Sequence, residues 1–128
     1  MSTLSWSHHL GPDSAALNIA GIDTSLGLKN TGGKRERYES LLRKFAERQV
    51  GTAEAIRVAL SVGDASTAGR EAHSLKGAAS TLGVTALAKH AADVEIAITT
   101  GQNVDEALMS LSHSLVAVVK AIRMSFPV

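Results

Sequence analysis

The stretch DASTAGREAHSLKGAASTLG, residues 64–83, decides the fold. Its small and apolar positions step by three and four residues, the spacing of one buried stripe along a helix that packs in a bundle. The stripe consists of Ala65, Ala68, Ala72, Leu75, Ala79 and Leu82. Asp64 is suited to cap the start of this helix, and Gly83 is expected to end it.

Two later segments repeat this stepping and predict two more helices. The first stripe consists of Val84, Leu87, Ala91, Val94 and Ile98, and the second of Leu108, Leu111, Leu115, Val118 and Ile122. Gly101 lies between them and is expected to end the first of these helices. Asn103 with Glu106 three residues later has the pattern of a capping box, which predicts the start of the second.

The chain before residue 64 predicts further helices with different faces. Asp23 is suited to cap a short helix that runs to about Asn30. The next segment is charged and carries one apolar stripe, made of Tyr38, Leu41, Leu42 and Phe45. Thr52 is then expected to cap a helix that ends at Gly63, with inward positions Ala53, Ile56 and Leu60. Basic and acidic residues alternate in the charged segment, which favours a solvated face over a nucleic-acid interface.

Helices joined by short turns lie as antiparallel neighbours, so we predict an all-α, antiparallel up-down four-helix bundle with a short extra N-terminal helix. The four helices are expected at 34–49, 52–82, 84–100 and 104–124. Residues 52–62 are either a separate short helix or the kinked first half of a longer one. We expect the domain to span residues 23–126 and residues 1–22 to be a tail or linker.

Composition excludes several classes of protein. The chain has 128 residues, 3% of them aromatic, which suits a single helical domain and argues against an all-β fold. Its net charge of +1 is too small for general electrostatic attraction to nucleic acid or anionic membranes. The chain contains no cysteine, so thiolate metal or redox sites are excluded. We see neither a nucleotide-binding motif nor an apolar run of membrane-spanning length, and expect no cofactor, no metal and no membrane insertion.

One lateral strip of the 64–82 helix has chemical character. It consists of Gly69, His73, Lys76, Gly77 and Ser80. A glycine inside a helix costs about 1 kcal/mol relative to alanine, so two glycines here suggest that space around the histidine is needed. Helical side chains lean towards the N-terminus, which should place the imidazole of His73 over Gly69 and bring Lys76 alongside it.

This strip suits transfer of a phosphoryl group to histidine. An exposed imidazole is mostly neutral near neutral pH and offers a lone pair without a resident base. The transferred group is negatively charged, and a cation at about 4 Å is worth roughly 1 kcal/mol in water and 4 near a protein surface. Lys76 is placed to supply that cation.

Residues 72–83, AHSLKGAASTLG, closely resemble the histidine phosphotransfer (HPt) domain of multistep two-component phosphorelays. The resemblance continues through Leu87 and Val94-Glu95, and weakly back to Gly21-Ile22-Asp23, Gly32-Gly33, Leu41-Leu42 and Phe45. It implies that His73 is the phosphoacceptor, that Lys76 stabilises the charge of the transferred group, and that Gly77 lets a partner approach. It also implies that Glu95 holds the imidazole ring.

The implied partners are receiver domains of a hybrid sensor kinase or a response regulator. They would supply the Mg²⁺ and the transfer machinery, so the chain would be a phosphocarrier and not an enzyme. The resemblance further implies a bacterial, cytoplasmic protein, and we expect a monomer. Family members contact their receivers through variable residues near the histidine, here Arg70, Ser74, Ala78, Ser80 and Thr81. Lys34 and Gly69 depart from the usual family pattern, which leaves partner preference open.

Two alternatives remain at this point. The phosphoacceptor and dimerisation domain of a sensor kinase also exposes a histidine on a bundle, but an acidic residue commonly follows that histidine, where this chain has Ser74. The other alternative is a helical interaction scaffold in which His73 has no role. The remaining histidines are interpreted as follows: His90 and His113 as surface or boundary residues, and the His8-His9 pair as an improbable metal site without further ligands.

Overall fold

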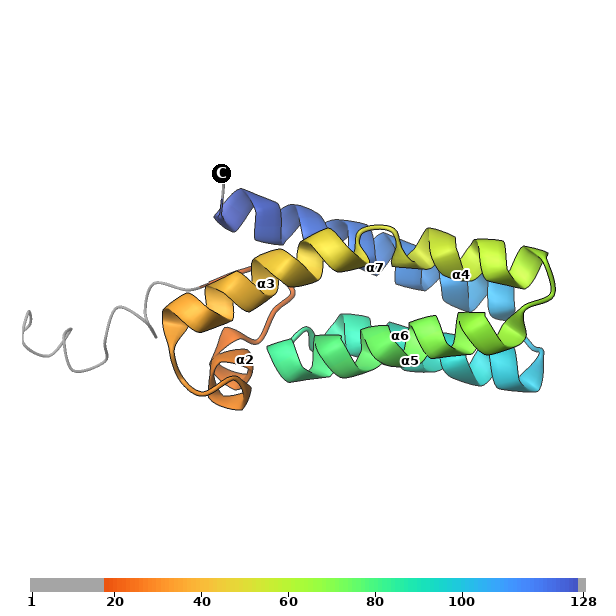
Figure 1. Cartoon of the computed structure of the whole chain (residues 1–128), viewed down its shortest axis with the longest axis horizontal. Coiled ribbons are helices and arrows are strands. Elements are labelled where there is room, and N and C mark those ends of the chain that lie inside the picture. The colour runs from red at the N-terminus through yellow and green to blue at the C-terminus, as the bar shows by residue number, and fades with distance from the viewer. Residues whose placement is uncertain (1–17, 127–128) are drawn as a thin grey trace, which may run out of the picture.

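The structure is a computed structural model that describes residues 18–126 (Figure 1). The helices are α2 (Thr24–Asn30), α3 (Arg35–Gln49), α4 (Thr52–Ser61), α5 (Ala65–Leu82), α6 (Thr85–Thr100) and α7 (Val104–Ser125). The described residues contain no strand, and the all-α prediction is confirmed. His8 and His9 lie outside the described residues.

The bundle has four positions, and the first is filled by two helices placed end to end (Figure 1). α3 and α4 run along one line, α5 returns beside them, and α6 and α7 complete the up-and-down path. Residues 52–82 therefore do not form one helix, and of the two interpretations the separate short helix is correct. The chain reverses at Gly63, whose φ of +79° is left-handed, and Asp64 starts α5 by accepting a hydrogen bond from the amide of Thr67 at 3.0 Å.

Of the predicted helix caps, the one at Thr52 is wrong and the one at Asn103 is correct in position only. Thr52 is the first residue of α4, not its cap, and its hydroxyl donates to the side chain of Gln49 at 2.5 Å. Asn103 stands at the cap position of α7, but its side chain makes no capping hydrogen bond there. The reason is its backbone, whose left-handed φ of +58° differs from the extended conformation that directs a capping side chain to the first turn.

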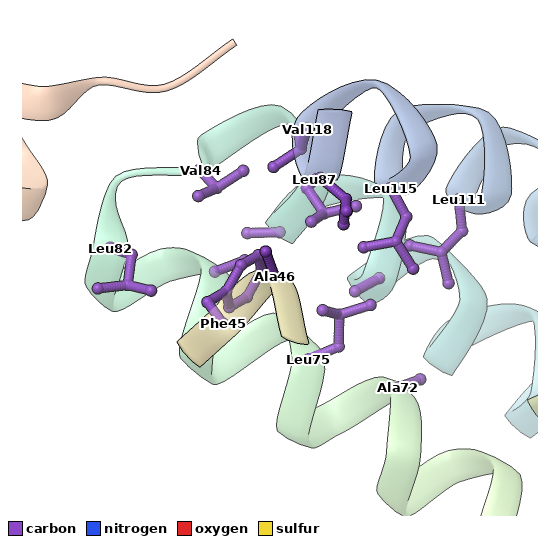
Figure 2. Packing of buried hydrophobic residues seen from close by; sticks show 14 of the residues in the cluster. Phe45, Ala46, Ala72, Leu75, Leu82, Val84, Leu87, Leu111, Leu115 and Val118 are labelled. Atoms are coloured by element: carbon purple, nitrogen blue, oxygen red, sulfur yellow. The ribbon is translucent and has the colours of Figure 1, made fainter. Parts of the chain in front are cut away.

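The core lies where the alanine-rich face of α5 meets the other helices. Ala68, Ala72, Leu75 and Ala79 are fully buried, whereas Ala65, in the first turn of α5, is exposed. In Figure 2, Leu75 and Leu87 face Leu111 and Leu115 of α7 from α5 and α6. Small side chains along α5 let a neighbouring helix come close. This close packing brings the outer edges of α5 and α6 together.

The short helix α2 closes the end of the bundle where α5 turns into α6. The amide of Asp23 donates to the carbonyl of Gly83 at 2.8 Å, and the Tyr38 hydroxyl donates to the carbonyl of Leu82 at 2.6 Å. Burial, together with the negative charge of Asp23, raises the pKa of Tyr38 to about 12. The hydroxyl therefore stays protonated and keeps this hydrogen bond.

The packed region begins before the predicted boundary at residue 23. Ile19 is buried in the core with an exposed fraction of 3%, and its carbonyl accepts a hydrogen bond from the amide of Ile22. The expected tail of residues 1–22 thus includes core residues at its C-terminal end.

The sequence was expected to contain no apolar run of membrane-spanning length, and α7 corrects this expectation. By length and composition alone, this helix is apolar enough to cross a membrane. A core helix of a soluble protein meets the same criterion, and one side of α7 does pack in the core through residues that include Leu111 and Ile122.

Candidate functional site

His73 stands on the outer side of α5, away from the buried stripe. Its side chain is 68% exposed, while its neighbours Ala72 and Leu75 are fully buried. The helical period explains this, because His73 lies outside the three-and-four stepping that faces the core. A reacting partner can therefore reach the imidazole without opening the bundle.

Glu95 of α6 orients the imidazole. Its Oε2 lies 3.0 Å from Nδ1 of His73, across the line where the two helices meet. Glu95 follows the buried Val94 on α6, which places its carboxylate at the edge of the helix that borders α5. No hydrogen bond to Nε2 of His73 is found within residues 18–126.

Lys76 contacts the same carboxylate through its other oxygen. Its Nζ lies 2.7 Å from Oε1 of Glu95, an atom otherwise sheltered from solvent. The sequence suggested that Lys76 would extend alongside the imidazole towards the transferred group. The structure instead pairs Lys76 with Glu95, so His73 and Lys76 share one carboxylate.

The charge of Glu95 follows from these contacts. The Lys76 ammonium 2.7 Å away lowers the pKa of Glu95 below its ordinary value, and contact with His73 adds to this effect against the cost of desolvation. Glu95 is therefore a carboxylate at neutral pH, and a carboxylate only accepts hydrogen bonds. We assign the proton of neutral His73 to Nδ1 on this ground, which leaves the lone pair on Nε2.

The two glycines of the strip leave open surface. A Cβ at Gly69 or at Gly77 would meet no atom within 4 Å outside the local backbone. The expectation that the imidazole lies over Gly69 is therefore wrong: the ring turns to α6, because Glu95 holds it there. The access role expected for both glycines stays a prediction.

The residues expected to contact a receiver lie around this strip. Ser74, Ser80, Thr81 and Arg70 are exposed, and Ala78 is half-buried. The Arg70 side chain donates to Thr67 Oγ1 at 3.2 Å, and the hydroxyl of Thr81 donates to the carbonyl of Gly77 at 3.0 Å. Their role in docking stays a prediction.

Sequence reasoning missed the contribution of α3 to this surface. A hollow of about 300 Å³ lies between α3 and α5, next to Gly77. Ala78 and Thr81 line it from α5, and the basic side chains of Lys44 and Arg48 line it from α3. The signal was the run of basic residues on α3, which was interpreted only as a solvated face.

His90 and His113 are the other histidines that the structure describes. His90 is half-buried and His113 is exposed, which agrees with their interpretation as boundary and surface residues. No cluster of three or more His, Cys, Asp or Glu side chains suited to a metal occurs in the part of the chain that the structure describes.

The described part of the chain is thus a helical bundle with an exposed histidine that contacts a carboxylate on the next helix. A family model described as "Hpt domain" matches residues 40–123, and the chain belongs to this family. A search of curated proteins and a search of solved structures each found no match.

Membership of the family carries a general role. Hpt domains take part in histidine phosphotransfer in two-component phosphorelays, and they interact with receiver domains of response regulators or kinases. They are phosphocarriers and not enzymes with their own catalytic site.

Proposed function

We propose that His73 is the phosphoacceptor and that it relays a phosphoryl group between the aspartates of two receiver domains. The observation that carries this proposal is the 68% exposed imidazole whose Nδ1 lies 3.0 Å from Glu95. This hydrogen bond fixes the ring and directs the lone pair to Nε2, the nitrogen without a protein partner in the described residues.

The transfer step needs no general base from this chain. Nε2 attacks the phosphorus of a receiver's aspartyl phosphate, the bond between phosphorus and the aspartate oxygen breaks, and the aspartate leaves as a carboxylate. The ring keeps its Nδ1 proton and becomes positively charged. Glu95 lies against that proton and offsets the charge, which stabilises the phosphorylated ring. The reverse sequence delivers the group to a second receiver.

In this proposal the receiver domains supply the groups that position the phosphoryl group and stabilise its negative charge. Phosphoryl transfer depends on positioning and on stabilising negative charge, which a receiver's Mg²⁺ site would provide. In this proposal Gly77 leaves room for the receiver next to His73, and the exposed residues around the strip, with Lys44 and Arg48 of α3, line the docking surface. The protein is proposed to act in the bacterial cytoplasm, with a hybrid sensor kinase or a response regulator as the source of the receivers.

A phosphotransfer assay tests the relay. The purified chain is incubated first with labelled ATP alone, then with a phosphorylated receiver domain, and finally with a second, unphosphorylated receiver. We expect no label from ATP, label on the chain from the first receiver, and loss of that label to the second. Labelling by ATP alone would favour the sensor-kinase alternative, and no labelling by any of a panel of receivers would favour the scaffold.

Replacing Lys76 with methionine should slow transfer without abolishing it. The change keeps most of the side-chain length but removes the positive charge that pairs with Glu95 on the strip that carries His73. A half-exposed cation is worth about 1 kcal/mol or slightly more, and roughly 1.4 kcal/mol is tenfold in rate, so we expect a several-fold to tenfold loss at low salt. The measurement is the rate of transfer from a phosphorylated receiver at low and high ionic strength.

Salt should reduce the difference between the wild type and Lys76→Met, since screening weakens the wild-type advantage. Lys89→Met is the matched control, because Lys89 lies on α6 and pairs with Asp93 at 3.4 Å, apart from Glu95. A defect of the same size at all salt concentrations would show that Lys76 shapes the docking surface sterically.

A further inference from the structure

The outer side of α7 leaves large apolar side chains uncovered. Only 33% of its most apolar 18-residue window is buried, although this helix is apolar enough to be a core element. Met109, Val116 and Met124 are 62%, 65% and 71% exposed, and Val50, which follows α3, is 51% exposed. These four side chains line the same region between α7 and the junction of α3 and α4.

The region is a continuous apolar groove. Two hollows of about 280 and 380 Å³ adjoin there and share Val50, Leu115 and Val116 in their walls. All of their lining residues come from α4, α7 and Val50 at the α3–α4 junction, and none comes from α5 or α6. His73 and Glu95 belong to α5 and α6, which form the other layer of the bundle in Figure 1. The groove is therefore separate from the phosphoacceptor.

The two ends of the groove carry opposite charges. Asp105 lines one end, and Lys120 and Arg123 line the other. Within residues 18–126 none of these three makes an ion pair, whereas Glu54 and Arg57 at the acidic end already pair with each other. On a helical period of 100° per residue, Asp105, Met109, Val116 and Lys120 fall on one face of α7. Two such strips packed antiparallel would bring the unpaired acid of each next to the unpaired bases of the other, with apolar surface between them.

We infer that a second copy of this chain covers the groove, with the two α7 helices antiparallel about a two-fold axis near residues 112 and 113. This register sets Asp105 opposite Lys120 of the second copy and Met109 opposite Val116 of the second copy. Each contact occurs twice by symmetry, as in any isologous interface. The two charged positions lie about 22 Å apart along the helix, at a rise of 1.5 Å per residue.

The inferred dimer differs from the monomer expected from the sequence. In this interface Ser112 and His113 lie near the axis, the apolar side chains Met109 and Val116 flank them, and the charges lie at the rim. Because the groove lies in the other layer of the bundle from His73, both phosphoacceptors stay accessible in the dimer. The inference does not depend on the proposed phosphorelay.

Sedimentation equilibrium of the full chain over a wide concentration range tests the dimer. We expect the wild type to change from monomer to dimer as concentration rises. Val116→Asp places two like charges near the axis and should weaken dimerisation about a hundredfold or more, with little change in thermal stability because Val116 is exposed. Ile96→Asp is the matched control, since Ile96 is 61% exposed on α6, and should dimerise like the wild type.

A charge exchange tests the register. Asp105→Lys and Lys120→Glu should each weaken the dimer about tenfold, because each sets like charges opposite one another. The double variant Asp105→Lys/Lys120→Glu should restore the wild-type dissociation constant, since it exchanges the two signs. A wild type that stays monomeric at every concentration, or a dimer that Val116→Asp does not weaken, would overturn the inference. A double variant that dimerises no better than the single variants would overturn the register.

Discussion

His73→Gln is expected to abolish phosphorylation of the chain by any receiver domain. Glutamine has no imidazole lone pair, and no other histidine in the described residues combines exposure with an orienting carboxylate. The product in the wild type is a phosphohistidine, which is labile to acid and stable to base. The measurement is the acid-labile, base-stable label acquired from a phosphorylated receiver.

Folding should not change in this variant, because the side chain is 68% exposed and makes no core contact. Surface substitutions of this kind usually change stability by less than about 0.5 kcal/mol. The helical circular dichroism and the melting temperature are therefore the controls. His113→Gln, at an exposed histidine on α7, should be labelled like the wild type. Normal labelling of His73→Gln would show that His73 is not the phosphoacceptor.

Gly27→Ala is expected to be the most destabilising of these substitutions. Gly27 of α2 is buried, and a Cβ there would collide with the carbonyl oxygen of Leu82 and the hydroxyl of Tyr38. Backbone and a buried, hydrogen-bonded ring cannot move away cheaply, so we expect a loss of about 3 kcal/mol. The measurement is the free energy of unfolding by denaturant, with a fall in melting temperature of roughly 10 °C or more.

Gly77→Ala is the matched control, and it should raise the free energy of unfolding where Gly27→Ala lowers it. Its Cβ would meet no atom within 4 Å outside the local backbone, and alanine favours a helix over glycine by up to about 1 kcal/mol. Tyr38→Phe removes the hydroxyl oxygen that a Cβ at Gly27 would meet. Gly27→Ala should therefore lower the free energy of unfolding by less in the Tyr38→Phe background than in the wild type. Equal stabilities of Gly27→Ala and the wild type would mean that α2 does not pack on Leu82.

Periodicity predicted the elements of this fold well, because the stripes of α5, α6 and α7 are buried apart from the exposed Ala65 and the half-buried Ile98, and the glycines at 83 and 101 end helices in the left-handed conformation. It did not predict how α3 and α4 join. Residues 52–61 pack on α5, as a separate helix would and the first half of one long helix would not, and their alignment with α3 depends on tertiary contacts that spacing does not report. The cap expected at Asn103 failed for a similar reason, since its backbone angle is set by the turn.

The site was predicted in part. His73, Lys76 and Gly77 could be placed on one face from their spacing along a single helix. The shared carboxylate of Glu95 joins two helices, and its position was inferred from the resemblance, not from spacing. Its ion pair with Lys76 was not foreseen, because helical lean places a side chain along its own helix and says nothing of a partner on the next one.

The shared carboxylate has a consequence for how such a protein diverges. His73, Lys76 and Glu95 all lie in the α5–α6 hairpin, whereas the basic wall of the hollow beside Gly77 comes from α3. The proposed phosphoacceptor and the groups that hold its ring thus lie in one segment, and part of the proposed docking surface lies in another. Under the proposed function, we expect substitutions at Lys44 and Arg48 to change which receiver is preferred while the imidazole keeps its tautomer. In this proposal, duplicated copies of such a gene acquire new partners through α3 while the arrangement of His73, Lys76 and Glu95 is kept.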